Sequence, residues 1–341
     1  MTDSLPSESA QIVVIGSGSW GSTLAWLFST AGKRVRLWTR NEAKAEAIRK
    51  TGMVEGPLRV GLPKSVEICC DLPAALSGAD IVILACTSQS MREVSGNLAA
   101  AWALDASAGK RTILVSAVKG LELHSFKRMS EVLEELLPGF PVCALSGPNL
   151  ADEILRGLPA ASVVASKPPH LYSVQKALST SRFRLYANTD IVGVELGGSL
   201  KNIIAVAAGI SDGLNLGDNA KAALLTRGIA EMSRLAVAMG AQSSTLAGLA
   251  GMGDLFATCA SANSRNHRLG IALAKGQSCE DALRELGAVA EGVPTTHAVC
   301  ELSQSMKLEL PIAQIVEETL EGKTTPERAI MTLMARPLAS E

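Results

Sequence analysis

Aromatic residues are scarce in this sequence, and neither sign of charge is in clear excess. Phe, Trp and Tyr make up 3% of the 341 residues, and 32 lysines and arginines stand against 33 aspartates and glutamates. A nucleic-acid-binding protein usually carries a basic patch or stripe, which this balance does not suggest. We therefore expect no nucleic-acid partner.

Long hydrophobic runs are missing as well. The amino terminus, MTDSLPSESAQ, has neither the basic start nor the apolar centre of a secretory signal. The apolar segment 202–210 is shorter than the ~18 residues that cross a bilayer. The sequence therefore predicts no membrane span.

Paired cysteines and clustered histidines are also absent. The seven cysteines are odd in number and include no CxxC pair, and the four histidines show neither HxH nor HExxH spacing. Unpaired thiols are typical of a reducing compartment, and zinc sites need closely spaced ligands. We expect a cytoplasmic protein that binds no metal.

The chain does contain enough apolar residues for a large core, since it is 47% hydrophobic and 19% charged. In its first half, short apolar runs alternate with helix-like segments, which predicts βαβ units and a mostly parallel sheet. The expected strands cover 11–16, 35–38, 81–85, 112–116, 142–145, 162–165 and 184–186. The expected helices between them cover 20–30, 42–50, 90–101, 127–137 and 171–179.

The strand signals stop near residue 190, and the rest of the chain predicts helices interrupted by glycine, proline and asparagine. A change of this kind marks a domain boundary. The expected fold class is therefore α/β with two domains. We predict a Rossmann dinucleotide-binding domain over residues 1–189 and an all-α substrate and catalytic domain over residues 190–341.

The segment QIVVIGSGSWGSTLAWLF contains a glycine motif, Gly16-x-Gly18-x-x-Gly21, between an apolar strand and a helix. In such a motif the first glycine allows a tight turn, the second admits a pyrophosphate, and the third lets helix and strand pack closely. The free N–H groups at the helix start would then face the phosphates. This context predicts a bound dinucleotide rather than a turn without a ligand.

The next strand ends in Thr39-Arg40-Asn41, where an NAD-selective site usually has an acidic residue. Arg40 could stack on adenine or pair with a 2′-phosphate, and it could equally be a solvated surface arginine. Both NAD and NADP therefore remain possible cofactors.

Polar residues follow three later strands, at the edge of the sheet where α/β proteins bind ligands. Lys119 comes soon after one strand, and the next is followed by SGPN at 146–149. Lys119 could face the cofactor or the substrate, or it could lie in a surface turn. Thr87 and Ser88 are expected to cap the following helix.

Three polar clusters interrupt the helical half. They are Lys201 with Asn202, then Asp254, then Ser264 with Arg265 and Asn266. Each has a structural explanation by itself, as a snorkelling lysine, a turn aspartate and a serine helix cap. Together they describe a site, because a helix start with an arginine forms a cradle for a phosphate or carboxylate.

Lys201 is expected at the head of an otherwise apolar helix, within ELGGSLKNIIAVAAGISDG. Burial lowers the pKa of an ammonium group, whereas a nearby carboxylate such as Asp254 raises it. The balance would let Lys201 exchange a proton near neutral pH. Asn202 could then hold a carbonyl or hydroxyl oxygen in line.

Eight motifs follow one another along nearly the whole chain: GSGSWGSTLA, VKGLE, SGPNLA, ELGGSLKNIIAVAAGISDGL, AEMSRL, GLAGMGDL, NSRNHRLG and AEGVPTT. In order and spacing they resemble the NAD(P)-dependent glycerol-3-phosphate dehydrogenases of the bacterial biosynthetic type. The resemblance implies reversible reduction of dihydroxyacetone phosphate to sn-glycerol 3-phosphate with NAD(P)H, which feeds glycerophospholipid synthesis. The partner is then a small phosphorylated substrate, and a homodimer is possible.

The resemblance also implies roles for single residues. Lys201 would be the proton donor and acceptor, and Lys119 would contact both the substrate and the nicotinamide. The other implied substrate contacts are Gly147, Asn149, Asp254, Ser264, Arg265 and Asn266. The implied dinucleotide contacts are Ser19, Trp20, Arg40, Lys119, Ala151, Val289 and Glu291, with Arg265 nearby. The chain departs from the family pattern at Asn149-Leu150, at Val118 and at 86–88.

Two alternatives remain. Reductases of 3-hydroxy acids or sugar acids also join a Rossmann domain to a helical domain, but they tend to place asparagine one helical turn after the lysine. A non-catalytic dinucleotide sensor would keep the glycines and would not need Lys201, Asp254 or Arg265. The presence of all three favours an enzyme.

Overall fold

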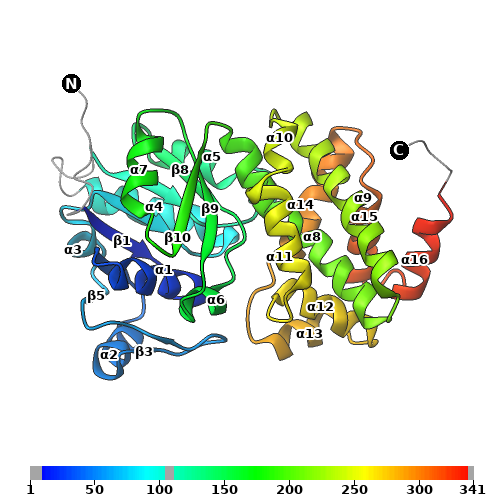
Figure 1. The fold of residues 1–341 in the computed structure, drawn as a ribbon, viewed down its shortest axis with the longest axis horizontal. Helices are drawn as coiled ribbons and strands as arrows, with labels where there is room; N and C mark the ends of the chain where they lie inside the picture. Colours follow the sequence, from blue (N-terminus) through cyan, green and yellow to red (C-terminus); the bar gives the residue numbers. More distant parts are fainter. Residues whose placement is uncertain (1–9, 104–110, 337–341) are drawn as a thin grey trace.

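The computed structural model describes residues 10–103 and 111–336, in which a sheet half and a helical half lie side by side (Figure 1). Across the sheet, the strands are β10 (Phe183–Asn188), β9 (Ala160–Ala165), β8 (Val142–Ser146), β7 (Ile113–Ser116), β6 (Ile81–Leu84), β1 (Gln11–Ile15), β2 (Arg34–Trp38) and β5 (Val66–Cys69). All neighbours are parallel except β8 and β9. The expected mostly parallel sheet is confirmed.

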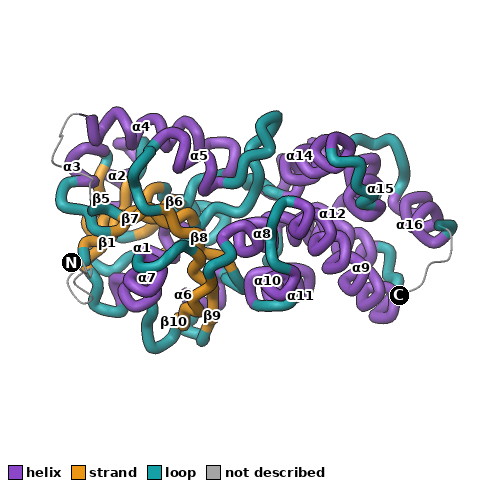
Figure 2. Tube along the Cα trace, turned by 90° about the horizontal axis from the view of Figure 1, so that it is seen from above, coloured by secondary structure: helices purple, strands orange, loops and turns teal. Residues whose placement is uncertain are grey.

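Helices cover both faces of the sheet (Figure 2). These helices are α1 (Ser19–Thr30), α2 (Glu42–Thr51), α3 (Leu72–Leu76), α4 (Met91–Ala103), α5 (Met129–Leu136), α6 (Ala151–Leu155) and α7 (His170–Leu178). Along β1, Ile12 and Val14 belong to the core beneath α1, while Val13 and Ile15 belong to the core beneath α4 and α5. This strand is continuously apolar because both of its faces are buried.

The helical half surrounds one long central helix. Its helices are α8 (Ile191–Gly213), α9 (Gly217–Ala238), α10 (Ser243–Leu246), α11 (Asp254–Ala260), α12 (Arg265–Ala274), α13 (Cys279–Leu286), α14 (Gly292–Ser305), α15 (Pro311–Leu320) and α16 (Pro326–Met334). A π-helical turn, η2 (Leu249–Gly253), leads into α11. Among the described helices, α8 is long and apolar enough to cross a membrane, but 83% of its most apolar window is buried inside the fold.

The expected strands and helices of the first half all exist, with ends that differ by two residues or fewer. The sequence did not predict β5, the short helices α3 and α6, or a small hairpin of β3 (Met53–Val54) and β4 (Val60–Gly61). β5 is an edge strand in which only Val66 is buried. Its sequence therefore carries little of the apolar signal that marks a central strand.

The expectation that Lys201 lies at the head of a helix is wrong. Helix α8 begins ten residues earlier, at Ile191, where the Asp190 side chain accepts a hydrogen bond from the Gly193 N–H at 2.8 Å. Two consecutive glycines usually weaken a helix. Here α8 passes through them because its neighbours approach the backbone closely, and Lys201 lies in the middle of the helix.

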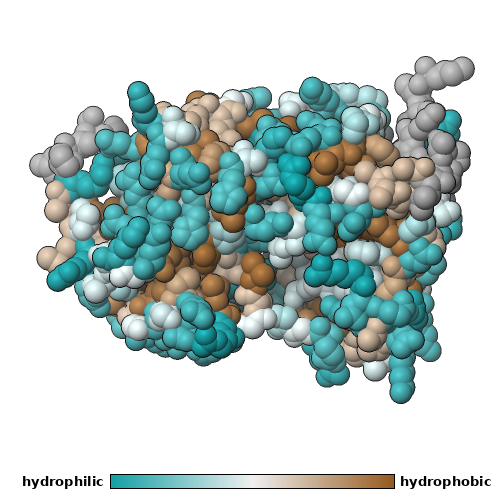
Figure 3. Space-filling view, turned by 180° about the vertical axis from the view of Figure 1, so that it is seen from behind, coloured by the Kyte–Doolittle hydropathy of each residue, from teal (hydrophilic) through white to brown (hydrophobic). Residues whose placement is uncertain are grey.

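The face of the molecule in Figure 3 mixes hydrophilic and hydrophobic side chains and has no single broad apolar area. Scattered exposed apolar residues are normal for a protein surface. The possible homodimer therefore stays a prediction.

Candidate active site

The glycine loop between β1 and α1 has the shape that a dinucleotide site requires. Gly16 has a φ of +113°, which L side chains rarely adopt, and its N–H donates to the Trp38 carbonyl at 3.1 Å. A Cβ on Gly21 would lie 1.9 Å from the Gly16 carbonyl oxygen, whereas a Cβ on Gly18 would meet open space. The loop is thus closed toward the sheet and open where a pyrophosphate would approach.

Alanine at two of these glycines should separate dinucleotide binding from folding. We expect Gly21→Ala to lower the free energy of unfolding by about 1–3 kcal/mol, because its methyl group meets backbone. Gly18→Ala should melt like the parent protein yet bind NADH weakly, since a clash of about 1.4 kcal/mol raises the Kd tenfold. Thermal melts and calorimetric titrations check both effects. Unchanged NADH binding by Gly18→Ala would remove the loop from the cofactor site.

Two lysines and one aspartate meet where the sheet half touches the helical half. Asp254, the first residue of α11, accepts hydrogen bonds from Lys201 Nζ at 2.5 Å and from Lys119 Nζ at 2.6 Å. Lys119 Nζ also donates to the Gly147 carbonyl at 2.9 Å. The alternative that Lys119 lies in a surface turn is therefore wrong, because its ammonium group belongs to this lysine cluster.

Small residues allow these elements to come so close. Lys119 and Gly147 follow the neighbouring parallel strands β7 and β8, so they lie at the same edge of the sheet. Helix α8 packs on this edge through Gly197 and Gly198. A Cβ on Gly197 would lie 2.5 Å from a carbonyl oxygen of η2, and one on Gly198 would lie 2.2 Å from Ser146 Oγ. Larger side chains would push Lys201 away from Asp254.

The surroundings of Lys201 suit proton exchange. Burial lowers the pKa of Lys201 to about 8, against the opposing effect of the Asp254 carboxylate, and the Lys119 ammonium lowers it further. Lys201 Nζ also donates to Thr258 Oγ1 at 2.5 Å. Sequence reasoning missed Thr258, although its position four residues after Asp254 puts both on one helix face. An amine with this pKa can both give and accept a proton near neutral pH.

The predicted anion cradle, Ser264 with Arg265, lies at the start of α12. The expected cap is confirmed, since Ser264 Oγ accepts a hydrogen bond from the His267 N–H at 3.3 Å. Arg265 is exposed, yet the protein around it lowers its pKa by desolvation, against the opposing effect of Glu291. None of the described residues accepts a hydrogen bond from its guanidinium, so these donors can bind an anion.

Asn202 and Asn266 connect the lysine cluster to the cradle. Asn266 Nδ2 donates to Asn202 Oδ1 at 2.9 Å, and Asn266 Oδ1 accepts from the Gly292 N–H at 2.9 Å. Both asparagines are buried. Because each is held by a neighbour, the Asn202 side chain keeps a fixed direction, as a substrate-orienting donor would need.

Glu291 joins the two halves at a second place. Its carboxylate accepts hydrogen bonds from the Ser88 N–H at 3.1 Å and from Ser88 Oγ at 2.5 Å. Thr87 stands at the expected N-cap position of the short turn before α4, but its side chain makes no cap hydrogen bond to the backbone, because Thr87 Oγ1 pairs with Ser90 Oγ at 2.9 Å. The Glu291 carboxylate is charged, so it is a stronger acceptor for the Ser88 hydroxyl than a neutral backbone carbonyl would be. Burial raises the pKa of Glu291, against the opposing effect of the Ser88 hydrogen bonds.

Two buried polar atoms at the end of β8 and just beyond it have no partner in the described part of the chain. Asn149 Nδ2 donates to Ser162 Oγ at 3.1 Å, but Asn149 Oδ1 and Ser146 Oγ have no hydrogen-bond partner among the described residues. Buried polar atoms are normally paired with protein or with ordered water, so these two oxygens need a further partner. The substrate contact at Asn149 stays a prediction.

The remaining dinucleotide candidates lie along the glycine loop, after strands and before α14. Ser19 and Trp20 begin α1, and Ala151 begins α6 after β8. The Arg40 side chain is 75% exposed, and Val289 is 46% exposed ahead of α14. The lysine cluster includes none of the five, and their contacts with a cofactor stay predictions.

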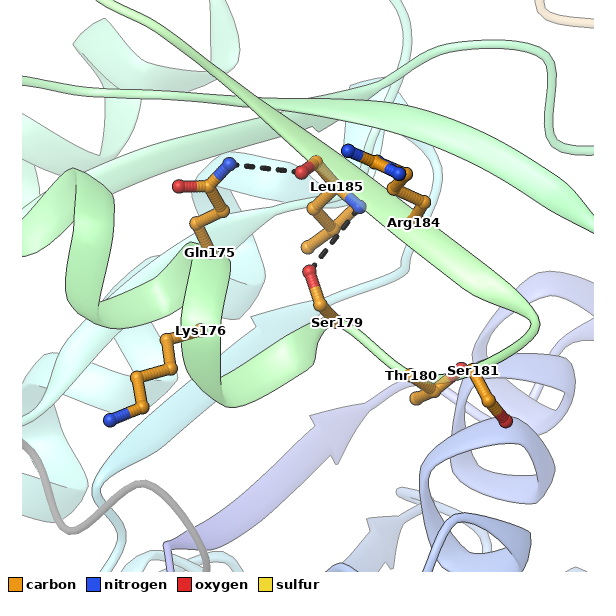
Figure 4. A pocket seen from close by; sticks show the side chains of 7 residues that line it. All are labelled: Gln175, Lys176, Ser179, Thr180, Ser181, Arg184 and Leu185. Carbon is orange, nitrogen blue, oxygen red and sulfur yellow. Dashed lines mark hydrogen bonds between the residues drawn. The ribbon is translucent and has the colours of Figure 1, made fainter.

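A separate hollow lies on the sheet half, against α7 and β10 (Figure 4). Its lining residues are Gln175, Lys176, Ser179, Thr180, Ser181, Arg184 and Leu185. Gln175 Nε2 donates to the Leu185 carbonyl at 3.0 Å, and Ser179 Oγ accepts from the Leu185 N–H at 3.3 Å. Polar groups of this hollow are thus already hydrogen-bonded to the backbone of β10, and none of the predicted site residues lines it.

Two family models match the chain in the same order as the two halves. The N-terminal model of NAD-dependent glycerol-3-phosphate dehydrogenase matches residues 11–172, and the C-terminal model matches residues 190–331. The chain belongs to this family.

Curated members of the family are similar over almost their whole length. The glycerol-3-phosphate dehydrogenase (NAD(P)+) of Thermoanaerobacter sp. (strain X514) is 46% identical over 328 residues, which cover 96% of this chain and 97% of the relative. The one of Chlorobium phaeobacteroides (strain BS1) is 46% identical over 331 residues, covering 96% and 97%. The predicted family is confirmed, and the protein is an NAD(P)-dependent oxidoreductase.

A solved member of the family has the same fold. The crystal structure of glycerol-3-phosphate dehydrogenase from Coxiella burnetii is 36% identical and matches with a TM-score of 0.88, covering 96% of this chain and 99% of that one. The match supports the α/β fold with its helical second half. Family membership favours a glycerol-3-phosphate dehydrogenase over both the hydroxy-acid reductase and the sensor.

Proposed function

We propose that this chain catalyses the reversible reduction of dihydroxyacetone phosphate to sn-glycerol 3-phosphate with NAD(P)H. The observation that carries the proposal is the lysine cluster, in which Asp254 holds Lys201 and Lys119 together between the dinucleotide half and the helical half. A buried, cationic cluster of this kind stabilises the negative charge that develops on a ketone oxygen during reduction.

The glycine loop and the sheet edge fit a nicotinamide dinucleotide, which supplies a hydride to the ketone carbon when bound. Lys201, in its protonated form, donates a proton to the carbonyl oxygen and takes it back in the reverse direction. Lys119 adds positive potential beside the same oxygen, and Asp254 keeps both ammonium groups in position. No other proton donor is needed, because one proton and one hydride balance the reduction.

The other site residues orient the substrate. Arg265, with Ser264 at the start of α12, holds the phosphate, while Gly147, Asn149, Asn202 and Asn266 surround the triose. Anchoring the phosphate at a distance from the ketone uses binding energy to orient the reacting carbon.

The proposed cofactor residues surround the dinucleotide. Gly16, Gly18 and Gly21 receive the pyrophosphate, and the other contacts are Ser19, Trp20, Arg40, Lys119, Ala151, Arg265, Val289 and Glu291. We further propose that residues 1–189 and 190–341 act as the dinucleotide and substrate domains. We propose that the product supplies glycerophospholipid synthesis and that the enzyme is cytoplasmic. We also propose that the protein can form a homodimer.

The direct test of this function is consumption of reduced nicotinamide, followed by absorbance after dihydroxyacetone phosphate is added. NADH and NADPH are assayed separately, and glycerol 3-phosphate must be identified as the product. Nucleotide binding without oxidation of either cofactor would instead support the dinucleotide sensor.

The pH dependence should report the Lys201 amine. Its pKa of about 8 means that Lys201 is mostly protonated below that pH and mostly neutral above it. Ketone reduction needs the protonated form, so kcat/KM for reduction should fall as the pH rises through about 8, while glycerol 3-phosphate oxidation should rise.

The variant Asp254→Asn tests this assignment of the pH profile. Because the Asp254 carboxylate raises the pKa of Lys201, its removal should shift the limb of the profile to lower pH. If the pH at which kcat/KM for reduction falls is unchanged in Asp254→Asn, a group other than Lys201 causes the fall.

A further inference from the structure

The Lys44 side chain reaches from a helix to the glycine loop instead of pointing into solvent. It belongs to the first turn of α2, the helix that follows β2, yet its Nζ donates to the Ser17 carbonyl at 2.7 Å. Ser17 is part of the glycine loop after β1. The Lys44 side chain thus connects the glycine loop with the segment after β2.

These two segments surround the adenosine ribose in a Rossmann domain. The pyrophosphate lies at the glycine loop, and the residue that selects the ribose hydroxyls or the 2′-phosphate follows the second strand. A side chain that spans both segments therefore lies beside the ribose. The acid that would bind two ribose hydroxyls is missing, because β2 is followed by Thr39 and Arg40.

The charge of Lys44 has no neutralising partner within 4 Å among the described carboxylates. Glu42 and Glu46 are the nearest acids along the helix, and Glu42 pairs instead with Arg49 at 2.9 Å. Partial burial lowers the pKa of Lys44. An ammonium group has three N–H donors, and the Ser17 carbonyl uses only one of them. Two donors and a positive charge therefore remain for an anionic ligand.

Arg40 adds a second cation on the same segment. Its guanidinium is 3.6 Å from the Glu93 carboxylate, and both side chains are mostly exposed, at 75% and 63%. Such exposed pairs contribute little to stability and exchange partners readily. A phosphate between Arg40 and Lys44 could replace Glu93 as the partner of Arg40.

We propose that Lys44 is the residue that selects NADP(H) over NAD(H), by binding the 2′-phosphate together with Arg40. This inference rests on the proposed function, since it concerns the cofactor of the same reaction. Lys44 is a specificity-determining residue and has no part in the proton transfer. The Ser17 carbonyl holds its ammonium at the ribose before the cofactor binds, which reduces the entropy lost on binding.

The test compares NADPH and NADH binding by calorimetry, at one fixed salt concentration, for the parent protein and Lys44→Gln. We expect the parent to bind NADPH more tightly than NADH. Loss of a charged hydrogen bond should raise the NADPH Kd of the variant about 10- to 100-fold, with the NADH Kd changed by less than about threefold. Lys44→Arg should keep most of the preference. A 2′,5′-ADP titration should show the same loss, because this probe carries the 2′-phosphate without nicotinamide.

The matched control is Lys50→Gln, which removes the same charge from an exposed position of the same helix and should change neither Kd. Equal weakening of NADPH and NADH in Lys44→Gln would overturn the proposal, because Lys44 would then only shape the glycine loop. No change in either Kd would overturn it as well. The proposed function is tested separately, by turnover of dihydroxyacetone phosphate by the parent enzyme with NADH.

Discussion

The variant Lys201→Met is expected to lower kcat for dihydroxyacetone phosphate reduction by about 100-fold or more, as loss of one stabilising donor typically does. Methionine keeps the length and apolar stem of lysine, so the buried position in α8 stays filled. Asp254 keeps Lys119 as a partner and is not left unpaired. The change therefore removes the proton donor without leaving an isolated buried charge.

Stopped-flow or steady-state absorbance at the reduced nicotinamide band gives kcat, and calorimetry gives the NADH Kd. The Kd should change by less than about threefold, because Lys201 acts on the substrate oxygen and a shift of that size is under 1 kcal/mol. Lys275→Met is the matched control, since it alters an exposed lysine at the end of α12. A Lys201→Met enzyme with nearly full turnover would contradict the mechanism.

The second large effect is expected for Arg265→Ala. Truncating one partner of a hydrogen-bonded charge pair costs about 2–5 kcal/mol, so kcat/KM for dihydroxyacetone phosphate should fall by about 30-fold or more. The loss should appear mainly in KM. Dihydroxyacetone has no phosphate, so its kcat/KM should fall by a smaller factor, which reports only the proposed contact of Arg265 with the cofactor.

Comparing the two substrates distinguishes the role of Arg265 from a general one. Arg268→Ala, which alters an exposed arginine one turn further along α12, should leave both substrates unaffected. If Arg265→Ala lowers kcat/KM equally for both substrates, Arg265 acts only through the cofactor or the ketone and does not hold the phosphate. If neither value changes, the phosphate anchor lies elsewhere.

Much of the fold was predictable because its signals are local. The glycine motif requires only a strand, three glycines and a helix in order, and the apolar runs of β1, β6 and β7 are continuous because both faces of the sheet are covered. The edge strand β5 was missed because most of its residues are partly exposed. The start of α8 was misplaced because glycines within a helix look like a break when their neighbours are unknown.

The sequence alone determined the family, the glycine loop and the residue types of the site, since motif order and apolar surroundings can be read along the chain. Only the tertiary structure decided that Asp254 bridges two lysines and that Ser88 binds Glu291. Asp254 is separated from Lys201 by 53 residues and from Lys119 by 135, and Ser88 is separated from Glu291 by 203. Local patterns report periodicity and burial, whereas pairs so distant in the chain depend on how α8, α11 and α14 pack against the sheet.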